Sequence, residues 1–469
     1  MGRVGAPQLK LAGFATRERT ADLRLPFRFG VATLTQATQI TLTVDVTFAD
    51  GRAATGHAAE SLLPKWFDKT LALTDADNME QLRTSLAIAL GLYGEAGFDT
   101  AFGLSAQVYA EQHARCAQRG LNPLVASYGP ALIDRAILDA LGRGLGLSFA
   151  EMITANVPGI SDGGLAPDLA GFDFGAFLGA LSPGRTIAVR HTVGLVDALT
   201  AGDLTETRLD DGLPETLEEV VRHYGCRYYK IKVGGDIAAD LDRLSRIAAV
   251  LDAGAGPYLS TLDGNEQYDD VEGITALWRR IEETPRLRAL AGSVLWIEQP
   301  IKRAVALERS VASLAAQKPL MIDESDGEVS AFPRAIALGY RGVSSKNCKG
   351  FYKSILNAAR AAQRNAAASG SYFLSAEDLS TWAGLSTQQD LALVSLLGLT
   401  HVERNGHHYM NGMSFASEEE QAAYLAAHPD LYARDTGRPV RLKIHEGDIA
   451  IGSLTCAGFG CGVPPDALG

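Results

Sequence analysis

Arg227-Tyr-Tyr-Lys-Ile-Lys-Val-Gly-Gly-Asp236 has the composition of a short β-strand that ends in a Gly-Gly turn before a helix. Lys230 and Lys232 stand two residues apart, so on a strand both ammonium groups point to the same face. Two like charges on the inner face of a sheet are costly unless that face also holds an anionic group. The stretch therefore predicts a buried strand whose inner face serves a functional site.

From Thr186 onward, the sequence alternates short apolar segments with amphipathic helices. The helix after the lysine strand has one apolar stripe, formed by Ile237, Leu241, Leu244, Ala248 and Leu251. Segments with strand composition lie at 186–194, 226–233, 258–263, 293–298, 319–323, 341–346, 371–375 and 399–403. Eight strands with intervening helices are typical of a (β/α) barrel, whose chemistry lies at the carboxyl ends of the strands. A doubly wound parallel sheet is the alternative architecture.

The regions on either side of this segment have other patterns. Residues 24–60 alternate apolar and polar side chains and contain a turn at Asp50-Gly51, which predicts an antiparallel meander. Residues 80–150 change to helical spacing, and the end of the chain returns to alternation, which we expect to complete the N-terminal sheet. The predicted division is an N-terminal α+β domain at 1–155, a Gly- and Pro-rich linker or insertion at 156–185, a barrel at 186–415 and a C-terminal tail at 416–469.

The composition argues against several classes of protein. With 46% hydrophobic and 21% charged residues, the chain of 469 residues is an ordinary globular protein. Its formal net charge of −12 argues against a nucleic-acid or anionic-membrane partner. The five cysteines are odd in number and scattered, as in a reducing compartment, although Cys456 and Cys461 could form a bridge. No apolar signal segment is visible, and the most apolar run, 391–399, is shorter than the roughly 20 residues that span a bilayer, so we expect a cytoplasmic protein.

Acidic side chains end three successive predicted barrel strands, at Asp263, Glu298 and Asp323. Barrel strands present their carboxyl ends at one rim, so these carboxylates should converge. Converging acids repel one another, and their pKa values rise unless a cation neutralises them. Oxygen ligands without Cys or His suit Mg²⁺, with Mn²⁺ as the usual substitute. A single strand-end acid is more often a helix cap or a solvated charge, but three in register favour a metal site.

Lys232 and Lys346 end the second and the sixth predicted strand, on opposite sides of a substrate held at the metal. A metal bound to a substrate carboxylate makes the α-proton more acidic and stabilises the enediolate that forms when this proton leaves. Lysine takes the proton only if its pKa falls toward neutrality, and Lys230 together with the metal supplies the positive field for this. Two opposed lysines allow one to remove a proton and the other to return it.

Five motifs follow one another in the barrel region: Lys230-Ile-Lys232, Asp263-Gly-Asn265, Trp296-Ile-Glu-Gln-Pro300, Ile322-Asp-Glu-Ser325 and Ser345-Lys-Asn347. In this order they resemble the enolase superfamily, in the branch of its mandelate racemase and muconate lactonizing enzyme family that has two acid/base lysines. The resemblance implies an α/β fold, a modified TIM barrel (β/α)7β under an α+β capping domain formed by the N-terminal region and the C-terminal tail. It also implies a homo-oligomer, with Mg²⁺ at the three acids and acid/base catalysis by Lys232 and Lys346.

The sequence departs from that pattern at several positions. No histidine lies between His223 and His401, so a His-Asp dyad is absent, and Gln299 stands where a second acid often follows the metal glutamate. The remaining candidates for substrate-binding or auxiliary roles are Asn265, Glu324, Glu377 and Asp378. Of these, Glu377 and Asp378 could bind substrate or orient Lys346, and a helix-capping role for Asp378 is equally plausible.

Two loops are candidates for substrate contacts. One is Asn405-Gly-His-His408, although His407 and His408 are more often solvated or structural at such a place. The other is the capping loop from Glu60 to Phe67, where the resemblance implies specificity contacts. Trp66 in this loop is simple packing unless it faces the barrel mouth.

Three functions are compatible with these residues. The leading hypothesis is Mg²⁺-dependent abstraction of the α-proton of a carboxylate substrate, which gives racemisation or epimerisation, cycloisomerisation, or loss of a β-leaving group as in dehydration. The second is a barrel enzyme that forms a lysine Schiff base, and the third is a non-catalytic carboxylate-binding protein that retained the metal site. The sequence does not identify the substrate.

Overall fold

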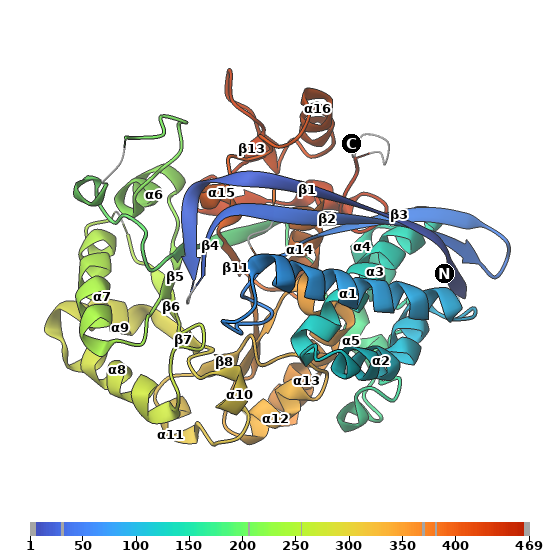
Figure 1. Ribbon diagram of the computed structural model, residues 1–469, viewed down its shortest axis with the longest axis horizontal. Coiled ribbons are helices and arrows are strands. Elements are labelled where there is room, and N and C mark those ends of the chain that lie inside the picture. Colours follow the sequence, from blue (N-terminus) through green and yellow to red (C-terminus); the bar gives the residue numbers. More distant parts are fainter. Residues whose placement is uncertain are drawn as a thin grey trace.

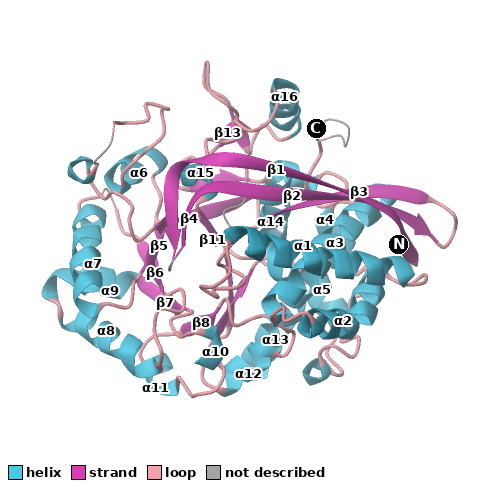
Figure 2. Cartoon of the chain, in the orientation of Figure 1, coloured by secondary structure: helices cyan, strands magenta, loops and turns pink. Residues whose placement is uncertain are grey.

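The computed structural model describes residues 6–29, 32–204, 207–254, 256–367, 371–379 and 382–463 (Figure 1). The N-terminal part is an antiparallel sheet of β1 (Leu9–Phe29), β2 (Ala32–Phe48) and β3 (Ala53–Ser61), which confirms the predicted meander. β1 begins well before residue 24, where the predicted meander began. The prediction missed this part of the strand because residues 14–18 are exposed and show no apolar alternation. Figure 2 shows the β1–β2 ribbon crossing above the helices and the barrel strands.

Three long helices follow the sheet: α1 (Asp75–Glu95), α2 (Ala101–Gln118) and α3 (Pro123–Leu145). α1 and α3 pack against the sheet, and α2 packs on these two helices. α3 begins where the Asn122 side chain accepts hydrogen bonds from two backbone amides of the first turn, and ends at Gly146, whose φ is 68°. Gly56 lets β3 lie directly on α3, because a Cβ at this position would lie 2.2 Å from the carbonyl oxygen of Ala136.

The second part is a closed barrel of parallel strands. In chain order these are β4 (Thr186–Val193), β5 (Tyr228–Lys232), β6 (Leu259–Asp263), β7 (Val294–Glu298), β8 (Leu320–Ile322), β9 (Gly342–Ser345), β10 (Phe373–Ala376) and β11 (His401–Arg404). Each strand overlaps its predicted segment. β11 pairs with β4, which closes the sheet and excludes the doubly wound alternative.

Helices connect successive barrel strands in the predicted (β/α)7β order. They are α6 (Leu217–Tyr224), α7 (Ile237–Asp252), α8 (Val271–Glu283), α9 (Arg288–Ser293), α10 (Arg303–Ala306), α11 (Ala312–Ala315), α12 (Ala331–Ala337), α13 (Phe351–Ala367) and α14 (Leu385–Leu396). The predicted turn after the lysine strand is confirmed, because Gly235 has a φ of 89° and Asp236 caps α7.

The segment predicted as a linker, 156–185, follows α4 (Phe149–Thr154) and contains a short 3₁₀ turn at Pro167–Leu169 and α5 (Phe174–Gly179). Arg360 of α13 holds it through an ion pair with Asp168 at 2.8 Å. The exact domain boundaries stay a prediction.

The C-terminal region contains α15 (Gly406–Tyr409), α16 (Glu418–Ala427), β12 (Tyr432–Ala433), β13 (Arg441–Leu442) and β14 (Asp448–Ala450). The expectation that this region completes the N-terminal sheet is wrong. β12 and β13 pair with each other, and β14 pairs antiparallel with residues 186–188 of β4, where the backbone edge is free because β5 pairs only with residues 190–193. Alternation indicates a half-buried strand but not the edge that it joins.

The last described residues return to the N-terminal domain without joining its sheet. The amide of Gly458 donates to the carbonyl of Leu147 at 3.0 Å, and Phe459 stacks on Phe149 at 3.8 Å between ring centroids. One hydrophobic core runs through the N-terminal domain and the barrel. The two parts are therefore packed as one body.

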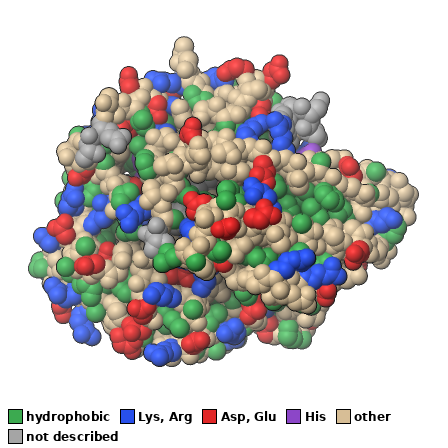
Figure 3. Space-filling view, viewed as in Figure 1, with side chains coloured by type: hydrophobic (Ala, Val, Ile, Leu, Met, Phe, Trp, Pro, Cys, Tyr) green, Lys and Arg blue, Asp and Glu red, His purple; other side chains and the backbone are tan. Residues whose placement is uncertain are grey.

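Other sequence expectations can be compared with the described residues. All five cysteines are free thiols. No helix in the described part of the chain is long and apolar enough to span a bilayer. On the face shown in Figure 3, acidic and basic side chains are interspersed.

Candidate active site

The ends of β5 to β9 bring the five strand-end residues together at the mouth of the barrel. Lys232 lies opposite Asp263 in the register of β5 and β6, and Asp263 lies opposite Glu298 in that of β6 and β7. Asp323 follows β8 directly, and Lys346 follows β9 directly. All five side chains are buried, so the candidate site is a set of charges withdrawn from water.

Lys230 lies at the centre of these charges. Its Nζ lies 3.0 Å from Asp263, 2.8 Å from Glu298, 2.7 Å from Glu377 and 3.0 Å from Glu403. Burial opposes the positive charge, but the carboxylates, Asp263 foremost, hold the pKa of Lys230 well above its ordinary value. Lys230 is therefore a permanent ammonium group that neutralises acids from several strand ends.

Lys232 and Lys346 each face one carboxylate. Nζ of Lys232 lies 2.6 Å from Oδ2 of Asp263, and Nζ of Lys346 lies 2.8 Å from Oδ2 of Asp323. Burial alone would lower the pKa of Lys346, but Asp323 outweighs burial and raises this pKa. In this structure the pKa of Lys346 does not shift toward neutrality, because its nearest charge is a carboxylate rather than a second cation.

Asp323 has a further partner that the sequence did not predict. Its Oδ1 accepts a short hydrogen bond from Ser344 and lies 3.4 Å from Nζ of Lys349. Lys349 also donates to Ser344 at 2.6 Å. Burial would raise the pKa of Asp323, but Lys346 and Lys349 hold it well below its ordinary value. The sequence did contain a signal for this second lysine, because Lys349 lies only three residues after Lys346 and could have been predicted to lie near the same carboxylate.

Glu298 is less well compensated than Asp263. Burial and the neighbouring carboxylates of Asp263 and Glu377 raise the pKa of Glu298 well above its ordinary value. Its Oε2 is buried and has no hydrogen-bond partner among the described residues. For Asp263, burial is outweighed by Lys230 and Lys232, so its pKa is lowered. Glu298 is therefore the acid that would gain from an additional cation.

The chemistry of Asp263, Glu298 and Asp323 fits Mg²⁺, because all three are buried oxygen donors and one oxygen of Glu298 lacks a partner. Within the described ranges, no three His, Cys, Asp or Glu side chains converge closely enough to coordinate an ion. The reason is that Lys230 bonds to both Asp263 and Glu298, and Lys346 bonds to Asp323. An ion would therefore compete with these lysines for the carboxylate oxygens.

Asn265 and Glu324 lie where the barrel rim meets the N-terminal domain. Nδ2 of Asn265 donates to Oε1 of Glu324 at 3.3 Å, and burial raises the pKa of Glu324. Lys69, from the loop after β3, donates to the carbonyl of Asn265 at 2.8 Å and lies 2.7 Å from Glu266 and 3.4 Å from Glu324. Lys69 was not predicted, because no local signal in a loop shows which barrel residue it reaches.

Glu377 and Asp378 have different partners. Glu377 pairs with Lys230 and with Arg190 of β4, and no hydrogen bond or ion pair of the described structure joins it to Lys346. Oδ2 of Asp378 accepts hydrogen bonds from the amides of Asn405 at 3.0 Å and Gly406 at 3.3 Å. Asp378 therefore holds the backbone at the start of α15, and because it also lines the cavity between the barrel and the N-terminal domain, its role toward substrate stays a prediction.

Glu403 is a site residue that sequence reasoning missed. Its Oε2 lies 3.0 Å from Lys230, and its Oε1 accepts a hydrogen bond from Thr192 at 2.7 Å. Burial would raise the pKa of Glu403, but Lys230 and Lys232 hold it well below its ordinary value. The signal was available, because Glu403 ends the last predicted strand as the metal-ligand candidates end theirs.

The remaining positions singled out in the sequence are structural. Gln299 connects the loop after β7 to the loop after β8, because its Oε1 accepts hydrogen bonds from the amides of Asp323 at 2.8 Å and Ser325 at 3.1 Å. The rings of His407 and His408 pack on His191, with centroids 5.3 and 5.1 Å away. Burial holds the pKa of both histidines well below the ordinary value, so they are neutral packing groups.

A small cavity of about 20 Å³ lies between the charges and the N-terminal domain. Its walls are formed by Phe27, Leu63, Trp66, Lys230, Lys232, Asn265, Lys346, Asp378, Leu379, Glu403 and Asn405. The Trp66 ring lies 4.4 Å from Nζ of Lys346, so Trp66 faces the barrel mouth. Lys232 and Lys346 thus line one cavity, which is apolar where Phe27, Leu63 and Trp66 cover it.

The chain is similar to known proteins in sequence and in fold. The model of the family described as enolase C-terminal domain-like matches residues 212–461. No curated protein matches the chain. The solved dipeptide epimerase from Enterococcus faecalis V583, complexed with Mg and the dipeptide L-Leu-L-Tyr, is 14% identical with a TM-score of 0.59, over 96% of this chain and 99% of that chain.

Two other solved structures have the same fold over nearly their whole length. The L-Ala-D/L-Glu epimerase from Bacillus subtilis is 16% identical with a TM-score of 0.56, over 96% of this chain and 98% of that chain. An enolase from Bradyrhizobium complexed with magnesium and mandelic acid is 18% identical with a TM-score of 0.57, over 98% of both chains. Because the family model covers more than half of the chain and includes the ends of β5 to β11, the chain belongs to the enolase C-terminal domain-like family, in the mandelate racemase and muconate lactonizing enzyme group of the enolase superfamily.

Proposed function

We propose that this protein removes the α-proton of a small carboxylate substrate through an enediolate and returns it, using Mg²⁺ or Mn²⁺ and two lysines. The observation that carries the proposal is that Lys232, from β5, and Lys346, after β9, line the same cavity. Membership of the family supports the general class, an enolase-superfamily isomerase. The finer assignment is a racemase or epimerase, with cycloisomerase or dehydratase chemistry as the other outcomes of the same first step.

Three carboxylates of the barrel mouth would hold the ion: Asp263, Glu298 and Asp323. When bound, the ion polarises the substrate carboxylate and makes its α-proton more acidic. The side chains of the protein itself carry out the proton transfers. Lys232 and Lys346 each hold a proton at Nζ, and an ammonium group is the form that returns a proton to the substrate carbon.

Lysine acts as a base only after it has lost this proton. Asp323, 2.8 Å from Lys346, keeps Lys346 protonated and raises its pKa. Lys346 can therefore act as a base only when the Asp323 carboxylate no longer pairs with it directly. Lys230, in contrast, stays an ammonium group because several carboxylates surround it. The handedness of the substrate decides which of Lys232 and Lys346 removes the proton.

The cavity roof determines what else the substrate carries. Phe27, Leu63 and Trp66 of the N-terminal domain exclude water from the lysines. We propose that they contact an apolar substituent, while Asn265 and Asn405 offer polar contacts. Solved relatives were crystallised with dipeptides or with mandelic acid, and both classes belong in a substrate screen.

The test is exchange of the substrate α-proton in D₂O, followed by NMR over a library of 2-hydroxy acids, acid sugars, amino acids and dipeptides. We expect exchange with at least one carboxylate, lost in EDTA and restored by Mg²⁺ or Mn²⁺. Lys232→Ala and Lys346→Ala should reduce it, and Lys302→Ala, an exposed lysine outside the site, should not. Exchange at the normal rate in both catalytic variants would refute the assignment.

The same samples address the other two hypotheses. Borohydride trapping of substrate on a lysine, with activity that survives EDTA, would indicate a Schiff-base enzyme instead. Tight carboxylate binding without exchange would indicate a non-catalytic protein. The homo-oligomer and the cytoplasmic location stay predictions.

A further inference from the structure

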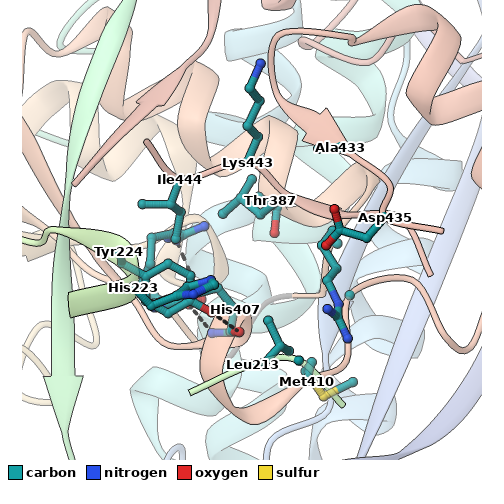
Figure 4. Close-up of a pocket in the computed structure, with 18 residues that line it drawn as sticks. Leu213, His223, Tyr224, Thr387, His407, Met410, Ala433, Asp435, Lys443 and Ile444 are labelled. Carbon is teal, nitrogen blue, oxygen red and sulfur yellow. Dashed lines mark hydrogen bonds and ion pairs between the residues drawn. The ribbon is translucent and has the colours of Figure 1, made fainter. Parts of the chain in front are cut away.

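A second, larger cavity of about 200 Å³ lies beyond the carboxyl ends of β10 and β11, where residues of α6, α15 and the β12–β13 hairpin line it (Figure 4). Leu213, Tyr224, His407, Met410, Arg441 and Ile444 line its central part. Among the described residues, it shares only Asp378 with the catalytic cavity. The proposed reaction gives this cavity no role.

One side of this outer cavity is aromatic. Tyr224 packs edge-on against His223 and His407, with ring centroids 4.7 and 4.9 Å away, and Figure 4 shows the three rings together. Burial lowers the pKa of His223 and holds that of His407 well below its ordinary value, so both rings are neutral near pH 7. Leu213 and Met410 lie near these rings in Figure 4, which gives the cavity apolar surface suited to a flat group.

Of the cations that line the outer cavity, Arg404 is paired with Asp378 and Asp390 and Lys443 is exposed, which leaves Arg441. Its Nη2 donates to Oδ1 of Asn411 at 2.6 Å and to the carbonyl of Asp211 at 2.8 Å, and it forms no ion pair with a carboxylate among the residues described. Burial lowers the pKa of Arg441, although the nearby carboxylate of Asp211, which is itself paired with Arg24, opposes this shift. The carboxylates that line the same cavity are Asp378, which caps Asn405 and Gly406, and Asp435, which is exposed at the rim.

We propose that the outer cavity binds a small anion that carries a flat apolar group. Its carboxylate or phosphate pairs with Arg441, and its apolar body packs on Tyr224, Leu213 and Met410. Lys443, which is exposed and extends away from the rings in Figure 4, adds positive charge at the rim. Binding here does not require the proposed reaction.

The test is isothermal titration of the whole protein with phenyl phosphate and with benzoate, which separate the two anionic groups, and with benzyl alcohol as the neutral analogue. We expect one of the anions to bind at one site per chain, and the alcohol to bind at least about tenfold more weakly. Absence of binding by both anions would overturn the proposal, as would equal affinity for the alcohol.

Variants locate the site. Arg441→Gln removes the cation, and Ala433→Trp fills the cavity from an exposed lining position, so each should weaken anion binding by about tenfold or more. Arg279→Gln on α8, an exposed arginine outside the cavity, is the matched control. Lys232→Met tests the catalytic cavity and should leave the affinity unchanged. Unchanged binding in either cavity variant, or its loss in Lys232→Met, would refute the assignment.

Discussion

The β5 side and the β9 side of the catalytic cavity both present buried lysines, but they surround them differently. On the β5 side, Lys230 contacts four carboxylates, and Lys232 shares Asp263 with it. On the β9 side, Lys346 contacts Asp323 and lies under the Trp66 ring. The comparison shows that burial alone does not define the role of a lysine. The number of anions around it separates a structural counter-ion from a group able to exchange its proton.

The largest expected effect concerns the two lysines proposed as acid and base. Lys232→Ala and Lys346→Ala should each reduce α-proton exchange of one enantiomer of the substrate by about 10²- to 10⁴-fold, because each lysine faces one side of the substrate. Exchange of the opposite enantiomer should largely persist. NMR in D₂O with separate enantiomers measures both rates, and a variant that exchanges both enantiomers normally would contradict the opposed arrangement.

Lys230→Met should instead lower the free energy of unfolding, by about 3–5 kcal/mol, because it leaves several buried carboxylates without their shared cation. Lys232→Met is the matched control from the same strand, and its loss should be smaller, since Lys232 contacts one carboxylate. Urea unfolding near pH 7, followed by circular dichroism, measures both. Equal losses in the two variants would show that the β5 lysines do not differ in this way.

Glu298 links pH to the stability of the β5 side. Its folded-state pKa is raised above the ordinary value of 4.5. Glu298 therefore does not lower the free energy of unfolding at a pH below its unfolded-state pKa, but it lowers this free energy as the pH rises through its folded-state pKa. In EDTA, Glu298→Gln should therefore gain stability relative to the wild type as pH rises above about 5. Urea unfolding of both proteins across this range measures the difference, and a constant difference would be inconsistent with the raised pKa.

Metal addition should reverse the order of stability of the wild type and Glu298→Gln. Mg²⁺ at about 100 times its dissociation constant stabilises a folded protein that binds it by about 2.7 kcal/mol. We expect this gain for the wild type and little of it for Glu298→Gln, which lacks one proposed ligand. Urea unfolding with and without Mg²⁺ tests it. A full Mg²⁺ gain in the variant would remove Glu298 from the ligand set.

The smallest expected effect is confined to the β9 side. Trp66→Leu removes an aromatic face that stabilises the Lys346 ammonium by about 0.5–1 kcal/mol, so the pKa of Lys346 should fall by less than one unit. The pH profile of exchange that depends on Lys346 should move to lower pH by this amount. The profile that depends on Lys232 serves as the internal control, and an equal movement of both profiles would argue against a local effect.

Much of the barrel could be predicted because its signals are local. Each strand is a short apolar run, and the ends of the second to sixth strands carried charged residues that are buried together at the barrel mouth, of which Lys232 and Lys346 line the catalytic cavity. Glu403 was missed although it ended its strand in the same way. Lys69 and Arg190 could not be found by this reasoning, because their partners Glu324 and Glu377 are distant in the sequence.

By itself, the sequence determined the barrel, the family motifs and the lysine pair on one strand face, because strand alternation and helical periodicity act over a few residues. Only the tertiary structure decided the electrostatics. Lys230-Ile-Lys232 predicted two like charges on one buried strand face, but only long-range packing surrounds Lys230 with four carboxylates and leaves Lys232 with one. A pKa depends on every charge within a few ångströms, whichever strand supplies it. The edge that β14 joins was decided in the same way, by which backbone groups of β4 the folded barrel leaves free.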